Sequence, residues 1–265
     1  MDLNGRKIIL TGASSGIGKE VLKELSKYNT HIIAVARNID NIPGISNRII
    51  PYSCDVSSRE NVDMLFEYAE KTFGKPDIFI ANAGFAYCEE ICEADWEHIE
   101  NIYRTNAVSP LYSLEKMKVL NMGHEYSVII TCSAVSRVAL PGYSLYCSTK
   151  AAVHSFADVY RFEKNDKGHL SIVYPIATAT NFFKTAGNMA PVPWPVQPAP
   201  KVAKAIVNGI LKNKRLIYPS KSFAVGNTLN RLLPFIYYFY SRSNAAKFKR
   251  WLQTERQLIS SSTPK

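Results

Sequence analysis

The sequence predicts an α/β domain built on a doubly wound parallel sheet of about seven strands, with helices on both faces. The chain has 265 residues, of which 46% are hydrophobic, enough for one large α/β domain or two small ones. Short apolar runs rich in β-branched residues recur along it, and segments with helical periodicity separate them. This alternation is typical of parallel strands joined by crossover helices, so functional residues are expected just after the strands.

The predicted elements follow one another along the first 219 residues. Strands are expected at residues 7–11, 32–36, 48–52, 77–81, 128–133, 170–174 and 216–218. Helices are expected at residues 16–28, 58–73, 95–119, 143–165 and 202–213. We therefore divide the chain into a main domain, residues 1–219, and a C-terminal helical extension, residues 220–265.

The positive charge lies almost entirely in the C-terminal part of the chain. The formal net charge is +10 at pH 7, from 32 basic and 22 acidic residues. Residues 201–265 contain 13 of the bases and a single acid, Glu255, so the first 200 residues are nearly neutral. A basic surface spread over the main domain is thus excluded, and with it the charge pattern of a nucleic-acid enzyme.

Segment composition predicts a cytoplasmic location and no metal site. The N-terminus lacks the apolar centre of a signal peptide, and the longest apolar run, residues 232–240, is too short to span a membrane and contains Pro234. The five cysteines form no CxxC pair, which favours reduced thiols. The five histidines show no HxxxH or HExxH spacing, so no metal is expected in the site.

A glycine-rich turn, TGASSGIG at residues 11–18, follows the first predicted strand and precedes a helix. Such a turn exposes backbone N–H groups at a helix N-terminus, where they bind the pyrophosphate of a dinucleotide. No lysine stands where an ATP-binding loop requires one. The alternative is a structural turn that is glycine-rich by chance. The residues expected to contact the cofactor here are Gly12, Ser14, Ser15, Gly16, Ile17 and Gly18.

The end of the second predicted strand favours NADP(H) over NAD(H). An acidic residue at this place would bind the 2′-hydroxyl of NAD, but the chain has Arg37, whose guanidinium suits a 2′-phosphate. The alternative is a solvated surface arginine. After the third strand, Asp55 and Val56 are expected beside the adenine, with the carboxylate accepting from its amino group.

A serine, a tyrosine and a lysine follow the fifth predicted strand. Ser133 comes directly after it, and Tyr146 and Lys150 are four residues apart on the next predicted helix, so they share a face. A nearby cation favours the phenolate and lowers the pKa of a tyrosine, which would make Tyr146 a proton carrier. Without further context, such a pair is usually a packed aromatic ring and a surface charge.

These motifs resemble the classical short-chain dehydrogenase/reductase family, from Lys7 to about Pro219. The resemblance rests on TGASSGIG at residues 11–18, Asp55, ANAG at residues 81–84, Asn106, Ser133, and Tyr146 with Lys150. It implies a Rossmann-type fold in which Asn82, Ala83 and Gly84 support the adenosine side of the cofactor. One departure is Ile176, which stands where the family usually has glycine after Pro175.

The resemblance also implies the catalytic roles. Asn106 would anchor a water connected to Lys150, Ser133 would bind the substrate carbonyl, and Tyr146 would donate the proton. Lys150 would hold the nicotinamide ribose and depress the pKa of Tyr146. Thr180 is expected to contact the carboxamide of the cofactor, and Pro175 and Thr178 to lie beside it.

The predicted function is that of an NADP(H)-dependent oxidoreductase acting on a carbonyl or secondary alcohol, with a hydrophobic ketone or aldehyde as substrate. Within this class, a 3-oxoacyl thioester reductase is an alternative. Outside it, the alternative is a dinucleotide-binding sensor or scaffold without turnover, which the complete catalytic set disfavours. A homodimer or homotetramer is expected.

Substrate contacts are expected from three segments. Residues 176–200 form a long apolar segment, either a lid over a hydrophobic substrate or a loop packed onto the domain. The other two are Phe85 with Tyr87, and residues 135–143.

The C-terminal extension combines aromatic and basic residues. An aromatic run at residues 235–240 is followed by Trp251, and bases surround it: Arg231, Arg242, Lys247, Lys249 and Arg250. This composition suits peripheral contact with an anionic membrane. Packing on the domain, or in an oligomer interface, is equally consistent with it, because Pro234 interrupts any single long amphipathic helix.

Overall fold

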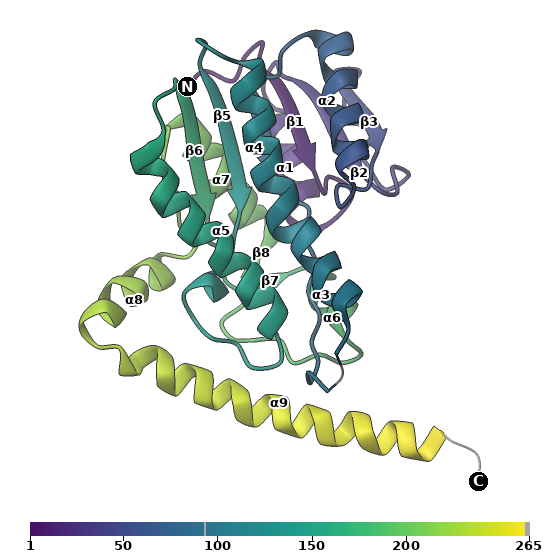
Figure 1. Cartoon of the computed structure of the whole chain (residues 1–265), viewed down its shortest axis with the longest axis vertical. Coiled ribbons are helices and arrows are strands. Elements are labelled where there is room, and N and C mark those ends of the chain that lie inside the picture. The colour runs from purple at the N-terminus through teal and green to yellow at the C-terminus, as the bar shows by residue number, and fades with distance from the viewer. Residues whose placement is uncertain (93, 263–265) are drawn as a thin grey trace.

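Seven strands form one fully parallel sheet (Figure 1). The structure is a computed structural model that describes residues 1–92 and 94–262; the side chains of Arg231 and residues 258–262 lie outside this description. The strands are β1 (Lys7–Thr11), β2 (His31–Ala36), β3 (Ile49–Ser53), β4 (Ile78–Ala81), β5 (Tyr126–Thr131), β6 (Gly168–Val173) and β9 (Leu216–Ile217). Their order is β3-β2-β1-β4-β5-β6-β9, which confirms the predicted doubly wound sheet.

Helices cover both faces of the sheet and bury two separate cores. The strands are apolar on both sides: in β1, Ile9 packs into one core, whereas Ile8 and Leu10 pack into the other. The core around Ile9 is completed by α2 (Arg59–Phe73), α4 (Ser109–Leu120) and α5 (Ser144–Glu163). The opposite core is completed by α1 (Gly16–Leu25) and α7 (Ala199–Leu211).

The predicted helix at residues 95–119 is not continuous. It consists of α3 (Trp96–Tyr103), a π-helical turn at Arg104–Val108, and α4. Pro110 lacks the N–H group that would donate to the carbonyl of residue 106 in a regular α-helix, and this gives a physical reason for the wide turn. The other predicted helices are present, with their ends displaced by up to three residues.

The segment at residues 176–200 is more ordered than a simple loop. It contains α6 (Phe182–Ala186), and its two ends pair as the short parallel strands β7 (Thr178–Ala179) and β8 (Gln197–Pro198). The pairing holds both ends of the segment beside the carboxyl edge of the main sheet. This segment, 176–200, is called the lid below.

Two helices form the C-terminal extension, α8 (Lys221–Leu232) and α9 (Phe235–Ser262). Helix α9 passes below the main domain in the view of Figure 1, and its far end projects beyond it. It is fixed by Ser241 Oγ, which donates to the carbonyl of Ala139 (2.7 Å), and by Trp251 Nε1, which donates to that of Asn188 (2.8 Å). Within the described residues, no helix is both long and apolar enough to cross a membrane.

Candidate active site

A cavity of about 870 Å³ lies at the carboxyl ends of the strands. Segments that follow six of them, β1, β2, β3, β4, β5 and β6, contribute to its wall, which places it where a doubly wound sheet binds ligands. Most of the predicted site residues line this cavity: Gly12, Ser15, Gly16, Ile17, Arg37, Asp55, Asn82, Ala83, Gly84, Ser133, Tyr146, Lys150, Pro175, Thr178 and Thr180. Four predicted residues, Ser14, Gly18, Val56 and Asn106, are not part of its lining.

The glycine turn between β1 and α1 has the backbone geometry of a phosphate-binding loop. Gly12 has φ +68°, a conformation that favours glycine. A Cβ on Gly18 would lie 2.0 Å from the carbonyl oxygen of Gly12, so Gly18 permits close packing instead of contacting the cavity. At the start of α1, the N-cap residue Ser15 makes no side-chain capping bond, which leaves the first N–H groups of the helix available to an anion.

Thr11 connects the glycine turn to the end of β4. Its hydroxyl oxygen accepts from the backbone N–H groups of Asn82 (3.0 Å) and Ala83 (3.1 Å). Asn82 returns a bond from Nδ2 to the Thr11 carbonyl (3.3 Å) and accepts from Thr131 Oγ1 (3.2 Å). Thr11 and Thr131 were not among the predicted site residues, although both stand where a strand ends. These bonds fix the ends of β1, β4 and β5 relative to one another.

Arg37 provides an exposed cation at the cavity, after β2, which lies three strands away from β5 and Ser133 in the sheet. Its side chain lines the cavity and has no hydrogen bond or ion pair with other described residues. Asp55 also lines the cavity, and its Oδ1 accepts from the backbone N–H of Ser57 (2.9 Å). Val56, in contrast, has its side chain buried in the sheet core and outside the cavity lining, so its contact with the cofactor stays a prediction. The free guanidinium and the exposed N–H groups of α1 together fit a phosphorylated dinucleotide.

Ser133, Tyr146 and Lys150 converge on the wall of the cavity near the end of β5. The Ser133 hydroxyl accepts from the N–H of Val135 (3.3 Å), and its interaction with the Tyr146 phenol lowers the pKa of that phenol. Lys150 is buried and donates from Nζ to the carbonyl of Thr131 (2.9 Å). Its Nζ lies 5.7 Å from the centroid of the Tyr146 ring. The phenol, the hydroxyl and the ammonium group are thus held by one strand end and one helix face.

Burial dominates the acid–base properties of these groups. It raises the pKa of Tyr146 above its ordinary value, and the hydrogen bond from Ser133 only partly lowers it. That Lys150 depresses the pKa of Tyr146 stays a prediction, because desolvation of the phenolate is the largest effect on this pKa. Burial also lowers the pKa of Lys150. Tyr146 is accordingly a neutral phenol at physiological pH, the form that donates a proton.

Asn106 lies behind the cavity and holds the backbone after β4. It is buried within the π-helical turn, and its Nδ2 donates to the carbonyl of Phe85 (2.8 Å) and to Thr149 Oγ1 (3.3 Å). Its Oδ1 accepts from the N–H of Phe85 (3.1 Å). The side chain therefore joins the segment after Gly84 to the helix that carries Tyr146 and Lys150.

Ile176 fits its place without the backbone conformation that favours glycine. Only Met189 and Asn213 among the described non-glycine residues have positive φ, so Ile176 is unstrained in this respect. Its carbonyl accepts from Thr178 Oγ1 (2.9 Å), and Thr180 Oγ1 accepts from the N–H of Phe182 (3.2 Å). The segment from Pro175 to Thr180 is thus ordered along the cavity.

The substrate side of the cavity is apolar. As expected, Phe85, Tyr87 and part of the segment 135–143 line it. In the lid, Phe182 packs 5.3 Å from the ring of Tyr146. Trp194 also lines the cavity, yet 74% of its surface is exposed. The sequence left open whether this segment covers the substrate site or packs onto the domain. In the structure, one part of the lid packs on the domain, and another part faces solvent at the cavity.

The C-terminal extension completes the cavity wall, which the sequence had not indicated. The contributing residues are Ser222, Phe223, Gly226, Ile236, Tyr237 and Tyr240. Phe223 and Tyr237 stack with centroids 6.5 Å apart. The site therefore crosses the predicted boundary at residue 219. The three-residue spacing of the aromatic side chains at 237 and 240 was the available signal.

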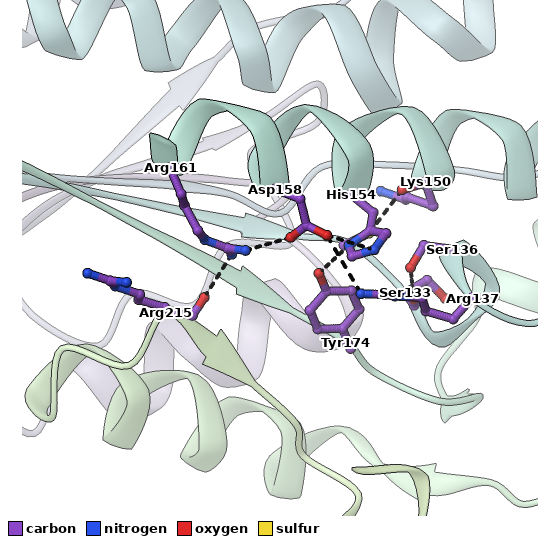
Figure 2. A network of polar contacts seen from close by, with 10 residues as sticks. Ser133, Ser136, Arg137, Lys150, His154, Asp158, Arg161, Tyr174 and Arg215 are labelled. Carbon is purple, nitrogen blue, oxygen red and sulfur yellow. Dashed lines mark hydrogen bonds and ion pairs between the residues drawn. The ribbon is translucent and has the colours of Figure 1, made fainter. Parts of the chain in front are cut away.

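A polar network supports the catalytic helix from behind (Figure 2). Asp158 Oδ1 accepts from Arg161 (2.7 Å), and its Oδ2 lies 3.4 Å from His154 Nε2 and 3.8 Å from Arg137. His154 Nδ1 lies 2.7 Å from the hydroxyl of Tyr174, at the end of β6. These contacts connect α5 to the segment after Ser133 and to the strand that precedes Pro175.

Comparisons with known proteins agree with the fold and the motifs. A family model described as short chain dehydrogenase matches residues 6–191. A 3-ketodihydrosphingosine reductase of Dictyostelium discoideum is 31% identical over 276 residues, covering 90% of this chain and 82% of that protein. A fatty acyl-CoA reductase of Mycobacterium tuberculosis is 31% identical over 192 residues, covering 68% of this chain but 65% of the relative's own length.

Solved structures show the same fold with bound nicotinamide nucleotides. A short chain dehydrogenase of Burkholderia cenocepacia in complex with NADP has a TM-score of 0.76 and 21% identity, covering 89% of this chain and 98% of that one. One of Burkholderia phymatum in complex with NAD has a TM-score of 0.76 and 17% identity, covering 87% and 94%. Since the family model spans well over half of the sequence, the chain belongs to the short-chain dehydrogenase/reductase family of nicotinamide-dependent oxidoreductases.

Proposed function

We propose that this protein is an NADP(H)-dependent reductase of a hydrophobic ketone or aldehyde, able to oxidise the corresponding alcohol in reverse. The observation that carries the proposal is that one cavity is lined by Ser133 and Tyr146, by the buried Lys150 and by the free guanidinium of Arg37. An apolar wall lies beside the tyrosine. A proton donor, a cofactor cradle and a lipophilic binding surface are what such a reduction requires.

The reaction needs one hydride and one proton. A bound NADPH would supply the hydride for the carbonyl carbon. Ser133 donates a hydrogen bond to the carbonyl oxygen as it becomes negative, and the neutral Tyr146 phenol transfers its proton to that oxygen. The carbonyl becomes a secondary or primary alcohol, and the tyrosine is left as a phenolate beside Lys150, whose ammonium stabilises it until a solvent proton arrives. Asn106 and Thr131 position this set through their contacts with Phe85 and Lys150.

Arg37 supports the choice of NADP(H). Its exposed guanidinium has no partner among the described residues and can bind a 2′-phosphate through two parallel hydrogen bonds. Asp55, farther along the same edge, stays available for the adenine. The opposite choice, NAD(H), usually has a carboxylate where Arg37 stands.

Two observations support a lipid-like substrate. The wall near Tyr146 is built largely from aromatic and aliphatic side chains of the lid and the extension. In addition, two relatives carry names that denote reductases of lipid carbonyl compounds, a fatty acyl-CoA and a 3-ketodihydrosphingosine. A 3-oxoacyl thioester fits the same wall and is the alternative substrate class. A sensor without turnover would not need the complete catalytic set.

Substrate panels with both cofactors test the proposal. Long-chain ketones, long-chain aldehydes, steroid ketones and 3-oxoacyl thioesters would be offered to the full chain, and consumption of NADPH and NADH followed by absorbance. We expect turnover with at least one apolar carbonyl compound, with higher kcat/KM for NADPH. Binding of NADPH without turnover on any of these classes would favour the sensor.

We further propose a cytoplasmic homo-oligomer that associates through the outer face of α5. Val159 and Phe162 lie three residues apart on this face and are 53% and 93% exposed, although both are apolar. Sedimentation equilibrium tests this: Phe162→Glu should shift a dimer or tetramer toward smaller species. An unchanged mass would show that another surface holds the oligomer.

A further inference from the structure

The corner between α8 and α9 exposes large apolar side chains on its outer side. On α8, three such residues follow the i, i+4, i+7 spacing of one helix face, and on α9 three follow i, i+3, i+4. Leu232 is 78% exposed and Phe239 is 61% exposed. We call this set the corner patch; it comprises Val225, Leu229, Leu232, Phe235, Tyr238 and Phe239.

The corner patch is not needed to close the protein core. The opposite faces of the same two helices already make the contacts with the main domain, through Phe223 and Tyr237 at the cavity and Phe248 near Gly142. Each helix thus has one apolar face toward the protein and a second one toward solvent. An aromatic surface of this kind, continuous around a helix corner, is typical of an interaction site.

Beyond the corner patch, the same outer face of α9 becomes basic. Arg242 lies seven residues after Phe235, and Lys249 and Arg250 lie two turns farther along, all exposed. In the described part of the chain, none of these three pairs with a carboxylate, whereas Arg256 does pair with Glu90. The only acid of residues 201–265 is Glu255. The outer face therefore presents apolar side chains at the corner and uncompensated cations along the helix.

We propose that this outer face docks on a lipid bilayer that carries anionic headgroups. The corner patch would enter the boundary between headgroups and acyl chains, and Arg242, Lys249 and Arg250 would contact lipid phosphates and carboxylates. A second copy of the chain fits less well, because a two-fold contact through this face would bring like charges together. Charge complementarity thus points to an anionic surface, and the exposed aromatic rings point to a lipid one.

Docking in this way has a consequence for the substrate. The cavity lies directly behind the corner, since Ile236, Tyr237 and Tyr240 line it from the inner face of α9. Trp194 of the lid lines the same cavity and is largely exposed. A lipid-like substrate could therefore pass from the bilayer into the site without crossing water. This consequence rests on the proposed function, whereas docking itself does not.

Co-sedimentation of the full chain with vesicles tests docking without substrate or cofactor. We expect binding to phosphatidylcholine vesicles that contain phosphatidylserine, weak binding to phosphatidylcholine alone, and release by high salt. Replacing Arg242, Lys249 and Arg250 by glutamine should lower the partition coefficient about 100-fold, at about fivefold per base. The double variant Phe235→Ser with Phe239→Ser should also lose binding.

Matched controls separate docking from general effects of charge and exposed apolar area. Lys201, Lys204 and Lys212 are exposed on or beside α7, and their replacement by glutamine removes the same charge. Met64 and Met122 are exposed elsewhere, and their replacement by serine matches the aromatic variant. Both control sets should bind vesicles like the unmodified chain. NADPH binding, measured by fluorescence, should be the same in all variants and shows that each is folded.

Several results would overturn docking. These are equal sedimentation with both vesicle types, equal loss of binding in the α9 and α7 charge variants, and no sedimentation at low salt. A change in oligomer mass in the Phe235 and Phe239 variant, with vesicle binding unaltered, would assign the corner patch to a second copy instead. The vesicle experiment does not measure NADPH turnover. A failure of docking therefore does not contradict the proposed reaction, and a failure of the proposed reaction does not contradict docking.

Discussion

Replacement of Asn106 by alanine should destabilise the protein more than a surface substitution of the same kind. Asn106 is 1% exposed and satisfies both backbone polar groups of Phe85, the carbonyl at 2.8 Å and the N–H at 3.1 Å. The alanine variant leaves these two groups without their partner. Each unpaired buried group costs about 1 to 3 kcal/mol; because Phe85 is half-buried, the lower half of this range applies to its two groups, and the free energy of unfolding should fall by about 2 to 4 kcal/mol.

Denaturant unfolding monitored by circular dichroism measures this loss. Asn101→Ala is the matched control, because Asn101 is exposed and, among the described residues, its side chain makes a single hydrogen bond, from Nδ2 to the Tyr87 hydroxyl at 3.3 Å. We expect the control to change the free energy of unfolding by less than about 0.5 kcal/mol. If Asn106→Ala unfolds at the same denaturant concentration as the control, Asn106 does not hold the Phe85 backbone, and its role as a positioning residue is refuted.

Three further predictions concern the cofactor and the pH dependence. Arg37→Asp should shift the ratio of kcat/KM for NADPH over NADH by about 100-fold toward NADH, because a phosphate partner worth about 1.5 to 3 kcal/mol is lost and a charge that repels the phosphate is added. Steady-state kinetics with both cofactors measure this ratio. An unmodified protein that prefers NADH would refute the premise. Gly18→Ala should weaken NADPH binding and lower the free energy of unfolding by about 1 to 3 kcal/mol, because its Cβ would lie 2.0 Å from the carbonyl oxygen of Gly12. Gly44→Ala is the control, since no described atom lies within 4 Å of its Cβ position, and it should change neither quantity. Titration with NADPH and thermal melting measure the two effects. Because burial raises the pKa of Tyr146, carbonyl reduction should be independent of pH through the neutral range and fall only at alkaline pH, while alcohol oxidation rises there; a reduction rate that falls between about pH 6 and 8 would contradict this.

The sequence predicted those parts of the fold and site that depend on short local patterns. Apolar runs gave all seven strands, and the spacing of Tyr146 and Lys150 on one helix face is realised in α5. Strands repeat every two residues and helices every 3.6 residues, and a short stretch of sequence is enough to recognise either period.

Features that depend on contacts between distant residues could not be predicted in this way. The pKa of Tyr146 is raised by burial, so its direction follows from tertiary packing and not from the four-residue spacing to Lys150. Similarly, Tyr237 and Tyr240 line the cavity because α8 and α9 turn back beneath it. Likewise, the burial of the Val56 side chain in the core could not be read from its position next to Asp55.

Tyr146→Phe in a single-turnover experiment tests the central claim most directly. NADPH would be bound in advance to the unmodified and variant proteins, mixed with the best carbonyl substrate, and its oxidation followed in the first turnover. The phenylalanine ring keeps the packing against Phe182 but cannot give a proton. We predict unchanged NADPH affinity and a hydride-transfer rate lower by about two to four orders of magnitude. A rate within about tenfold of that of the unmodified protein would contradict Tyr146 as the proton donor.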